Sequence, residues 1–266
     1  MTTAAAALIR HRPRPGRAVQ QTLTIAHRNL MQLRADPDQL MDATIMPIIF
    51  TLLFVYVFGG AISNSRHEYI QYLLPGIMAQ LVAFTAMATG VGLNSDFHTG
   101  VMDRFRSLPI ARSAVLAGRI ATDCAKLLIG TGVMLAFGTL LGFRPSGNAL
   151  QIAAAMGLAT AFGFALCWVS ALIGLSMSSP QAVQQIGFLW LIPVQFGSSI
   201  FAPVGTMPGW LQAFVKANPT SLVADTCRGL LSGGPVADSL WGALAWIAGI
   251  TAVAAPLAVR RYRKRR

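Results

Sequence analysis

The strongest constraint in this sequence is a set of long apolar segments that contain no charged residue. Each is near the roughly 17–25 residues that an α-helix needs to cross a bilayer. The segments cover residues 43–62, 72–93, 127–143, 149–175, 183–201 and 240–259. Because they are apolar on every side rather than along one stripe, lipid suits them better than water. The sequence therefore predicts an all-α membrane protein with six transmembrane helices.

The basic residues argue against nucleic-acid binding, although the net charge is +12. A groove for phosphates needs its charges on one folded face, whereas here twelve Lys and Arg residues flank the first and last apolar segments. They are Arg10, Arg12, Arg14, Arg17, Arg28, Arg34, Arg260, Arg261, Arg263, Lys264, Arg265 and Arg266. Only 11% of the chain is charged, against about 25% in soluble domains. This placement is typical of charges that orient a membrane protein.

The distribution of Lys and Arg between alternate connections predicts the orientation. All of them lie in the N-terminal segment, the connection 94–126 or the C-terminal tail, except four: Arg66, Arg144, Lys216 and Arg228. Cytoplasmic connections carry the excess of Lys and Arg. We therefore expect a multi-pass protein of the plasma membrane with both termini in the cytoplasm.

An amphipathic stretch precedes the first apolar segment. Val19, Leu23, Ala26, Leu30 and Leu33 recur at three- and four-residue steps, with polar residues such as Arg28 and Arg34 between them. This pattern favours a helix that lies on the cytoplasmic membrane surface. A helix that simply faces water is the alternative.

The connection between the fifth and sixth segments is unusually apolar. Trp210, Leu211, Phe214 and Val215 form an apolar face within residues 202–239, which several prolines interrupt. The pattern favours short re-entrant helices that dip into the outer leaflet, with a surface loop as the alternative. The chain reads as one transmembrane domain, residues 18–261, between basic tails at 1–17 and 262–266.

No motif for catalysis, nucleotide binding or metal binding is present. The chain has no Gly–Lys pair for a phosphate loop, and His67–Glu68 is not followed by a second His at zinc-site spacing. The three cysteines form no CxxC pair. We therefore expect no catalytic residue, no metal site, no cofactor and no enzymatic activity in this chain.

Ionisable residues approach the apolar segments only at their ends. Asp42 precedes the first segment, and Asp123 shares a helix face with Arg119 and Lys126, where the three side chains can pair. An ion-coupled secondary transporter usually places such groups near mid-membrane. That class, and a membrane assembly subunit that transports nothing, stay as alternatives. Otherwise the energy for transport has to come from a partner.

The cytoplasmic connection after the second segment is the natural place for that partner. It contains Gly100-Val-Met-Asp-Arg-Phe-Arg-Ser-Leu-Pro109, which suggests a short helix that exposes Arg104 and Arg106 and ends at Pro109. A charged loop that only orients the protein is the alternative.

This loop resembles that of permeases in the type-2 ABC transporter family, above all those of daunorubicin/doxorubicin-resistance exporters of actinobacteria. Further matching stretches run through the chain between Leu23 and Arg261. They are Met46–Pro47, Phe54–Ile62, Tyr69–Gly76, Gly142-Phe-Arg-Pro145, Met207-Pro-Gly-Trp-Leu211, Asn218–Pro219 and Arg228–Gly229. The loop together with the Pro-Gly-Trp segment is a fairly specific signature.

The resemblance implies a bacterial exporter in which this chain is the permease. Such permeases have six spans, an N-terminal surface helix, a cytoplasmic coupling helix and re-entrant helices before the last span. Two permeases, identical or homologous, assemble with two cytoplasmic ABC ATPase subunits, which bind the ATP and Mg²⁺. The cargo implied is a hydrophobic drug, antibiotic or lipid.

Carried onto this sequence, the resemblance assigns roles to two groups of residues. The contact with the ATPase falls on Gly100, Asp103, Arg104, Arg106 and Pro109, and the surface helix that shares it contains Leu23, Arg28, Leu30 and Arg34. Candidates for a hydrophobic cargo path come from the second and fifth spans. They are Phe84, Met87, Phe188, Trp190 and Phe196, which fit lipid contact or helix packing equally well.

Overall fold

The computed structural model of the chain describes residues 38–62, 65–100 and 112–264. Every regular element within these ranges is helical. The α-helices are α2 (Asp38–Leu53), α3 (Gly59–Ile62), α4 (Arg66–His98), α6 (Arg112–Leu140), α7 (Ala149–Ser176), α8 (Pro180–Phe196), α9 (Gly209–Ala217), α10 (Pro219–Ser232) and α11 (Ala237–Lys264). A π-helical segment, Phe54–Phe58, joins α2 to α3. The expected all-α fold is confirmed.

Four helical stretches are long and apolar enough to cross a membrane: Arg66–His98, Gly118–Leu140, Ala149–Ser176 and Ala237–Tyr262. They correspond to the second, third, fourth and sixth predicted spans. The first predicted span falls on α2, the π-helical segment and α3. The fifth falls on α8, which has 17 residues. The count of six therefore stays a prediction, although a helix lies at each expected position.

Several helix boundaries differ from the predicted spans. The largest difference is in α6, which begins at Arg112 rather than at residue 127; within this added part, Arg119 and Asp123 find partners on α4. The fifth predicted span ended at residue 201, whereas α8 ends at Phe196 and Gly197 caps it. An apolar run marks only the part of a helix that suits lipid. The helix continues beyond the run wherever its polar groups find hydrogen-bond partners.

Helix starts follow from local capping. Ser65 accepts a hydrogen bond from the backbone N–H of Glu68 at the start of α4 (3.1 Å). Asn148 and Gln151 form a reciprocal capping box at the start of α7. Each such cap contributes about 1 kcal/mol to helix stability. At its far end α10 stops at Gly233, whose φ of +73° suits glycine.

The helix α4 lies at the centre of the bundle, where it packs against α6, α7, α8 and α10. Its contact with α7 is the closest, because Gly90 and Gly174 let the two backbones meet. Ser170 on α7 accepts from the N–H of Gly90 (3.1 Å) and donates to the carbonyl of Met87 (2.9 Å). Small residues and interhelical hydrogen bonds are the usual means by which membrane helices associate.

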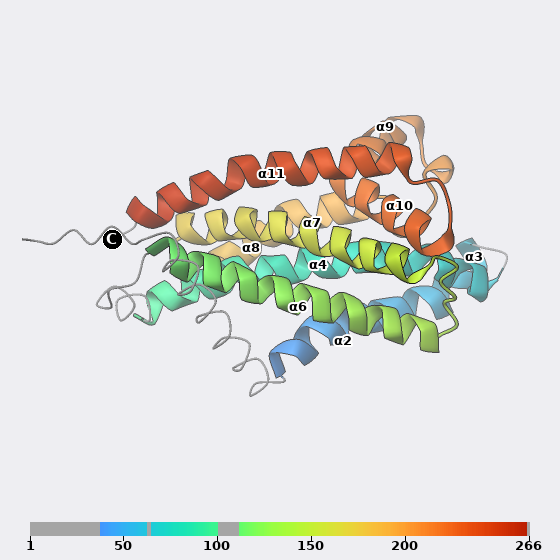
Figure 1. Ribbon diagram of the computed structural model, residues 1–266, viewed down its shortest axis with the longest axis horizontal. Coiled ribbons are helices and arrows are strands. Elements are labelled where there is room, and N and C mark those ends of the chain that lie inside the picture. Colours follow the sequence, from blue (N-terminus) through green and yellow to red (C-terminus); the bar gives the residue numbers. More distant parts are fainter. Residues whose placement is uncertain (1–37, 63–64, 101–111, 265–266) are drawn as a thin grey trace, which may run out of the picture.

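The bundle has two distinct ends, which Figure 1 shows at left and right. At the loop end, α4 ends at His98, α6 begins at Arg112, and residues 177–179 join α7 to α8. At the cap end lie α3, α9, α10 and the connection 141–148 between α6 and α7. The C-terminal part of α11 returns to the loop end.

Candidate functional site

Most residues assigned to the contact with an ATPase lie outside the described residues. This applies to Asp103, Arg104, Arg106 and Pro109 of the loop, and to Leu23, Arg28, Leu30 and Arg34 of the surface helix. Gly100 is described. It follows α4 in a turn with φ of +73°, a conformation that L side chains rarely adopt. The roles of these two groups stay predictions.

An ion pair joins the two helices that flank this loop. The guanidinium of Arg119 on α6 pairs with the carboxylate of Asp96 on α4, and the side chains are 26% and 32% exposed. The guanidinium lies against Gly92, where a Cβ would require it to shift. The loop end therefore has a direct link between α4 and α6 near the points where each leaves for the loop.

A second polar group lies about one turn deeper. The carboxylate of Asp123 on α6 accepts a hydrogen bond from the hydroxyl of Thr89 on α4 (2.8 Å). The Lys126 ammonium lies 3.9 Å from the same carboxylate, which agrees with the pairing expected from their spacing. The ion pair of Arg119, in contrast, runs across to Asp96 rather than along its own helix. We call Thr89, Asp96, Arg119, Asp123 and Lys126 the loop-end clamp.

A double-mutant cycle on Arg119→Met and Asp96→Asn measures the strength of this link. Because both side chains are partly exposed, we expect a coupling energy of about 0.5–1.5 kcal/mol, favourable for the pair. Chemical unfolding in detergent micelles provides the free energies. In the matched control cycle Asp96→Asn is combined with Arg228→Met at the cap end, and the two effects should be additive. Additivity in the first cycle as well would mean that the pair contributes nothing.

The five candidates for a cargo path separate into three places. The rings of Phe84 on α4 and Phe188 on α8 lie with centroids 6.2 Å apart. Met87 meets Gly187 one turn further along, where a Cβ would approach its sulfur to 2.6 Å. These side chains form what we call the α4–α8 seam. Phe196 instead stacks on Phe201 beyond the end of α8, with centroids 5.2 Å apart, and is half exposed.

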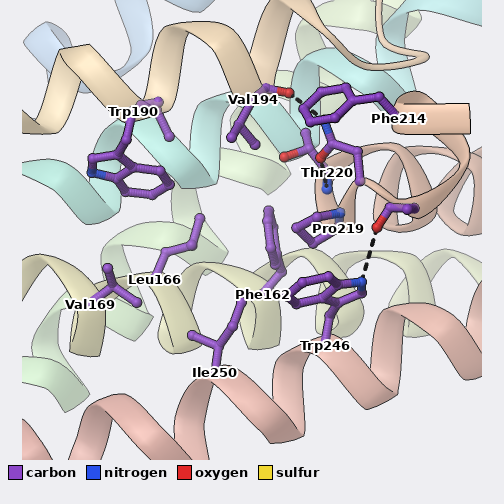
Figure 2. A pocket seen from close by; sticks show the side chains of 13 residues that line it. Phe162, Leu166, Val169, Trp190, Val194, Phe214, Pro219, Thr220, Trp246 and Ile250 are labelled. Atoms are coloured by element: carbon purple, nitrogen blue, oxygen red, sulfur yellow. Dashed lines mark hydrogen bonds between the residues drawn. The ribbon is translucent and has the colours of Figure 1, made fainter. Parts of the chain in front are cut away.

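Trp190 lies on a different face of α8, where it lines a cavity of about 370 Å³. Figure 2 shows this cavity between Phe162 and Leu166 of α7, Trp190 of α8, and Trp246 and Ile250 of α11. The indole N–H of Trp246 donates to the carbonyl of Ala217 (3.1 Å) at one edge. An apolar cavity of this size suits a hydrophobic ligand or a lipid chain. Sequence reasoning missed its other walls, because most of them come from the fourth and sixth spans and from α9 and the start of α10.

Arg228 on α10 is the centre of a polar network at the cap end. Its guanidinium pairs with Asp225 and lies over the ring of Tyr72, with 3.7 Å between its carbon and the ring centroid. It also donates to two backbone carbonyls, those of Tyr72 (3.0 Å) and Ser199 (3.1 Å). The Tyr72 hydroxyl donates to the same Ser199 carbonyl (2.6 Å). The sequence singled Arg228 out only as an outer charge and as part of a matching stretch.

The short segment after α8 is bound into this network. The Ser199 hydroxyl donates to Asp225 (2.8 Å), and its backbone N–H donates to the hydroxyl of Ser221 (3.1 Å). The Tyr69 hydroxyl donates to the carbonyl of Phe201 (3.0 Å). We call this network the cap lock, because it holds α4, residues 198–201 and α10 together. The cap lock consists of hydrogen bonds and one ion pair, an arrangement that suits a structural role.

Comparisons with known proteins find relatives that match most of the chain. The model of the family described as ABC-2 type transporter matches residues 20–231. The daunorubicin resistance ABC transporter permease protein DrrB1 of Streptomyces coeruleorubidus is 41% identical over 254 residues, which cover 96% of this chain and 90% of that protein. The probable doxorubicin resistance permease DrrC of Mycobacterium tuberculosis is 28% identical over 243 residues, or 91% of this chain and 88% of that protein. The putative transport permease ycf38 of Cyanophora paradoxa is 24% identical over 224 residues, which cover 80% and 75%.

Proposed function

The chain belongs to the ABC-2 type transporter family, and from this membership we propose how it works as the permease subunit of an ABC exporter. The observation that carries the function is a likeness of 41% identity to a drug-resistance permease over 96% of the chain. The four membrane-length helices fit a membrane permease.

We propose six membrane crossings, with the loop end in the cytoplasm. The helix from Asp38 to Ile62 supplies the first crossing, and α8, with 17 residues and a length of about 26 Å, supplies the fifth. The four cations expected outside lie at the cap end, as the positive-inside rule requires: they are Arg66 in the first turn of α4, Arg144 in the connection 141–148, Lys216 on α9 and Arg228 on α10. One permease domain, residues 18–261, contains these crossings between two basic cytoplasmic tails.

In this topology α9 and α10 are the re-entrant helices. Both are shorter than a crossing, and α10 packs on α4, α7 and α11. Its buried face includes Val223, Ala224 and Cys227. Irregular backbone at membrane depth is tolerated where protein covers it, and the cap lock supplies partners for the N–H, carbonyl and hydroxyl of Ser199 and for the carbonyl of Phe201.

The energy for transport comes, in our proposal, from a cytoplasmic ABC ATPase that binds ATP and Mg²⁺. Gly100, Asp103, Arg104, Arg106 and Pro109 contact this subunit, and the surface helix from Leu23 to Arg34 shares the contact. The loop-end clamp then carries a displacement of the loop into α4 and α6 together. Two ATPase copies act on two permeases, either identical or homologous.

The cargo we propose is a hydrophobic drug or antibiotic, because relatives are named for daunorubicin and doxorubicin resistance. Phe84, Met87 and Phe188 provide an apolar, aromatic seam between α4 and α8 for a planar molecule. Trp190 contributes to the separate cavity of Figure 2, where a lipid chain or cargo fits. Phe196, half exposed near the cap end, would face the exit.

Charge reversal in the loop tests the coupling. With permease and ATPase reconstituted in proteoliposomes, we expect Arg104→Glu with Arg106→Glu to lower ATP-driven daunorubicin transport at least tenfold. Membrane insertion and nucleotide hydrolysis by the ATPase should persist, because the charges serve the contact between subunits. Transport and hydrolysis are measured on the same vesicles.

The control reverses the same number of charges at the cap end, in Arg144→Glu with Lys216→Glu, which should leave transport within about twofold. Unchanged transport in the loop variant would remove the assigned role of Arg104 and Arg106. Transport that persists without ATP and stops when the proton gradient is dissipated would instead support an ion-coupled transporter.

A further inference from the structure

Two glutamines are sealed inside the bundle with no hydrogen-bond partner among the described residues. Gln80 on α4 is 2% exposed and Gln195 on α8 is 0% exposed. The side-chain oxygen and nitrogen of each are all unpartnered. An amide buried without partners is unfavourable in water-soluble proteins and more so in a membrane interior. Both side chains therefore reduce the stability of this conformation.

Helical spacing places Gln80 on the face of α4 that meets α8. Gly76, Gln80, Phe84 and Met87 follow one another at steps of four, four and three residues, which keeps them on one face. The two ends of this row, Gly76 and Met87, contact α8 or the segment that follows it. A Cβ at Gly76 would lie 2.9 Å from Ile200, and Met87 meets Gly187.

The same reasoning places Gln195 opposite Gln80. Gly187, Leu191 and Gln195 are four residues apart and form the buried face of α8. The helices run antiparallel, since Gly76 lies beside Ile200 and Met87 beside Gly187. Between these two contacts, the level of Gln80 on α4 corresponds to the level of Gln195 on α8.

The surroundings of this pair combine aromatic and polar character. The rings of Phe84 and Phe188 lie on the side of the loop end. The cap lock, including Tyr72, lies on the other side. A glutamine amide offers two N–H donors and one carbonyl acceptor and carries no charge. The pair therefore matches neutral groups such as hydroxyls and carbonyls rather than a phosphate or an ammonium.

We propose that Gln80 and Gln195 are the hydrogen-bonding part of a cargo site in the α4–α8 seam, and that they bind hydroxyl or carbonyl groups on a planar aromatic cargo. In this conformation the two amides are buried between α4 and α8. They become accessible to cargo when α8 separates from α4. The hydrogen bonds that the amides form with cargo in the open conformation offset the cost of burying them without partners in the closed conformation. The inference rests on the proposed exporter function.

Binding selectivity tests the site directly. The probes are anthracene and a hydroxylated anthracene, both fluorescent, and each is titrated into the purified permease. Both affinities are corrected for the partitioning of each probe into the detergent. After this correction we expect the wild-type protein to bind the hydroxylated probe at least tenfold more tightly than anthracene. Gln80→Leu with Gln195→Leu should remove this preference and leave the affinity for anthracene within about twofold.

Thermal unfolding distinguishes a binding role from a structural one. Because the substitution removes unpartnered amides, the double variant should unfold at a temperature equal to or above that of the wild type. Gln184→Leu, on the exposed side of α8, is the matched control and should alter neither affinity. A clear loss of stability in the double variant, equal loss of both probes, or no wild-type preference would each overturn the proposal.

ATP-driven export of the two probes separates this inference from the function beneath it. If the selectivity changes as expected but neither probe is exported with ATP and the ATPase present, the exporter function fails and the binding site stands. If both probes are exported by wild type and double variant at the same ratio, the exporter stands and the glutamine site fails.

Discussion

Replacing Gly90 with valine is expected to prevent the permease from reaching its folded state. A Cβ at this position would run into the backbone carbonyl of Ser170 on α7, far inside any real contact distance. Backbone cannot rotate away as a flexible side chain can, so α4 and α7 would have to separate along their whole contact. We expect a loss of at least about 3 kcal/mol in stability, at the upper end of overpacking effects.

The reciprocal substitution, Gly174→Val on α7, should have an effect of similar size, because its Cβ would meet the backbone of Gly90. Valine at Gly157 is the matched control, since that position of α7 has open space around it and should change stability by less than about 0.5 kcal/mol. The yield of monodisperse protein in detergent and its thermal unfolding report the outcome. A well-folded Gly90→Val variant would show that the two helices do not need this close contact.

Substituting Arg228 with methionine should have the second-largest effect, centred on the cap lock. The change removes an ion pair with Asp225, two hydrogen bonds to carbonyls and the contact over the Tyr72 ring. Ser199 is buried, whereas the side chain of Asp225 is 38% exposed, so most of the expected destabilisation of about 2–3 kcal/mol comes from the carbonyl that loses its donor and from the lost ring contact. Lysine should restore only part of this, since an ammonium cannot reproduce the planar fork of arginine.

Hydrogen exchange measured by mass spectrometry locates the effect. Residues 198–201 and α10 should exchange faster in Arg228→Met, while α7 should keep its protection. Lys216→Met removes an exposed cation from the neighbouring α9 and is the matched control, with no expected change. Uniformly faster exchange would contradict a local lock and indicate that Arg228 supports the bundle as a whole.

The positions of the helices could be predicted from the sequence, because each long apolar run indicates a segment that is more stable in lipid than in water. The third predicted span began at residue 127, whereas α6 begins at Arg112, so that Arg119, Asp123 and Lys126 lie inside the helix. Arg119 pairs with Asp96 on α4 and Asp123 accepts from Thr89 on α4, while Lys126 lies 3.9 Å from Asp123. A pattern along one helix cannot reveal partners on another, so this boundary depends on tertiary structure.

The candidate sites were harder to predict, since they depend on which face of a helix meets which neighbour. Phe188 and Trp190 are two residues apart, yet one lies in the α4–α8 seam and the other lines the cavity of Figure 2. Gln80 and Gln195 are visible in the sequence as polar interruptions of apolar runs. Only the packing shows that both are buried, unpartnered and at the same level.

The close union of α4 and α7 has a mechanical consequence. With its 33 residues, α4 is a rod about 50 Å long, and its attachment to α7 doubles its thickness and resists bending. We therefore expect a force applied at the loop end of α4 to tilt α4 and α7 together as one rigid unit, without bending either helix. We expect α8, which packs less extensively on α4 than α7 does, to be the helix that changes its position relative to the α4–α7 pair.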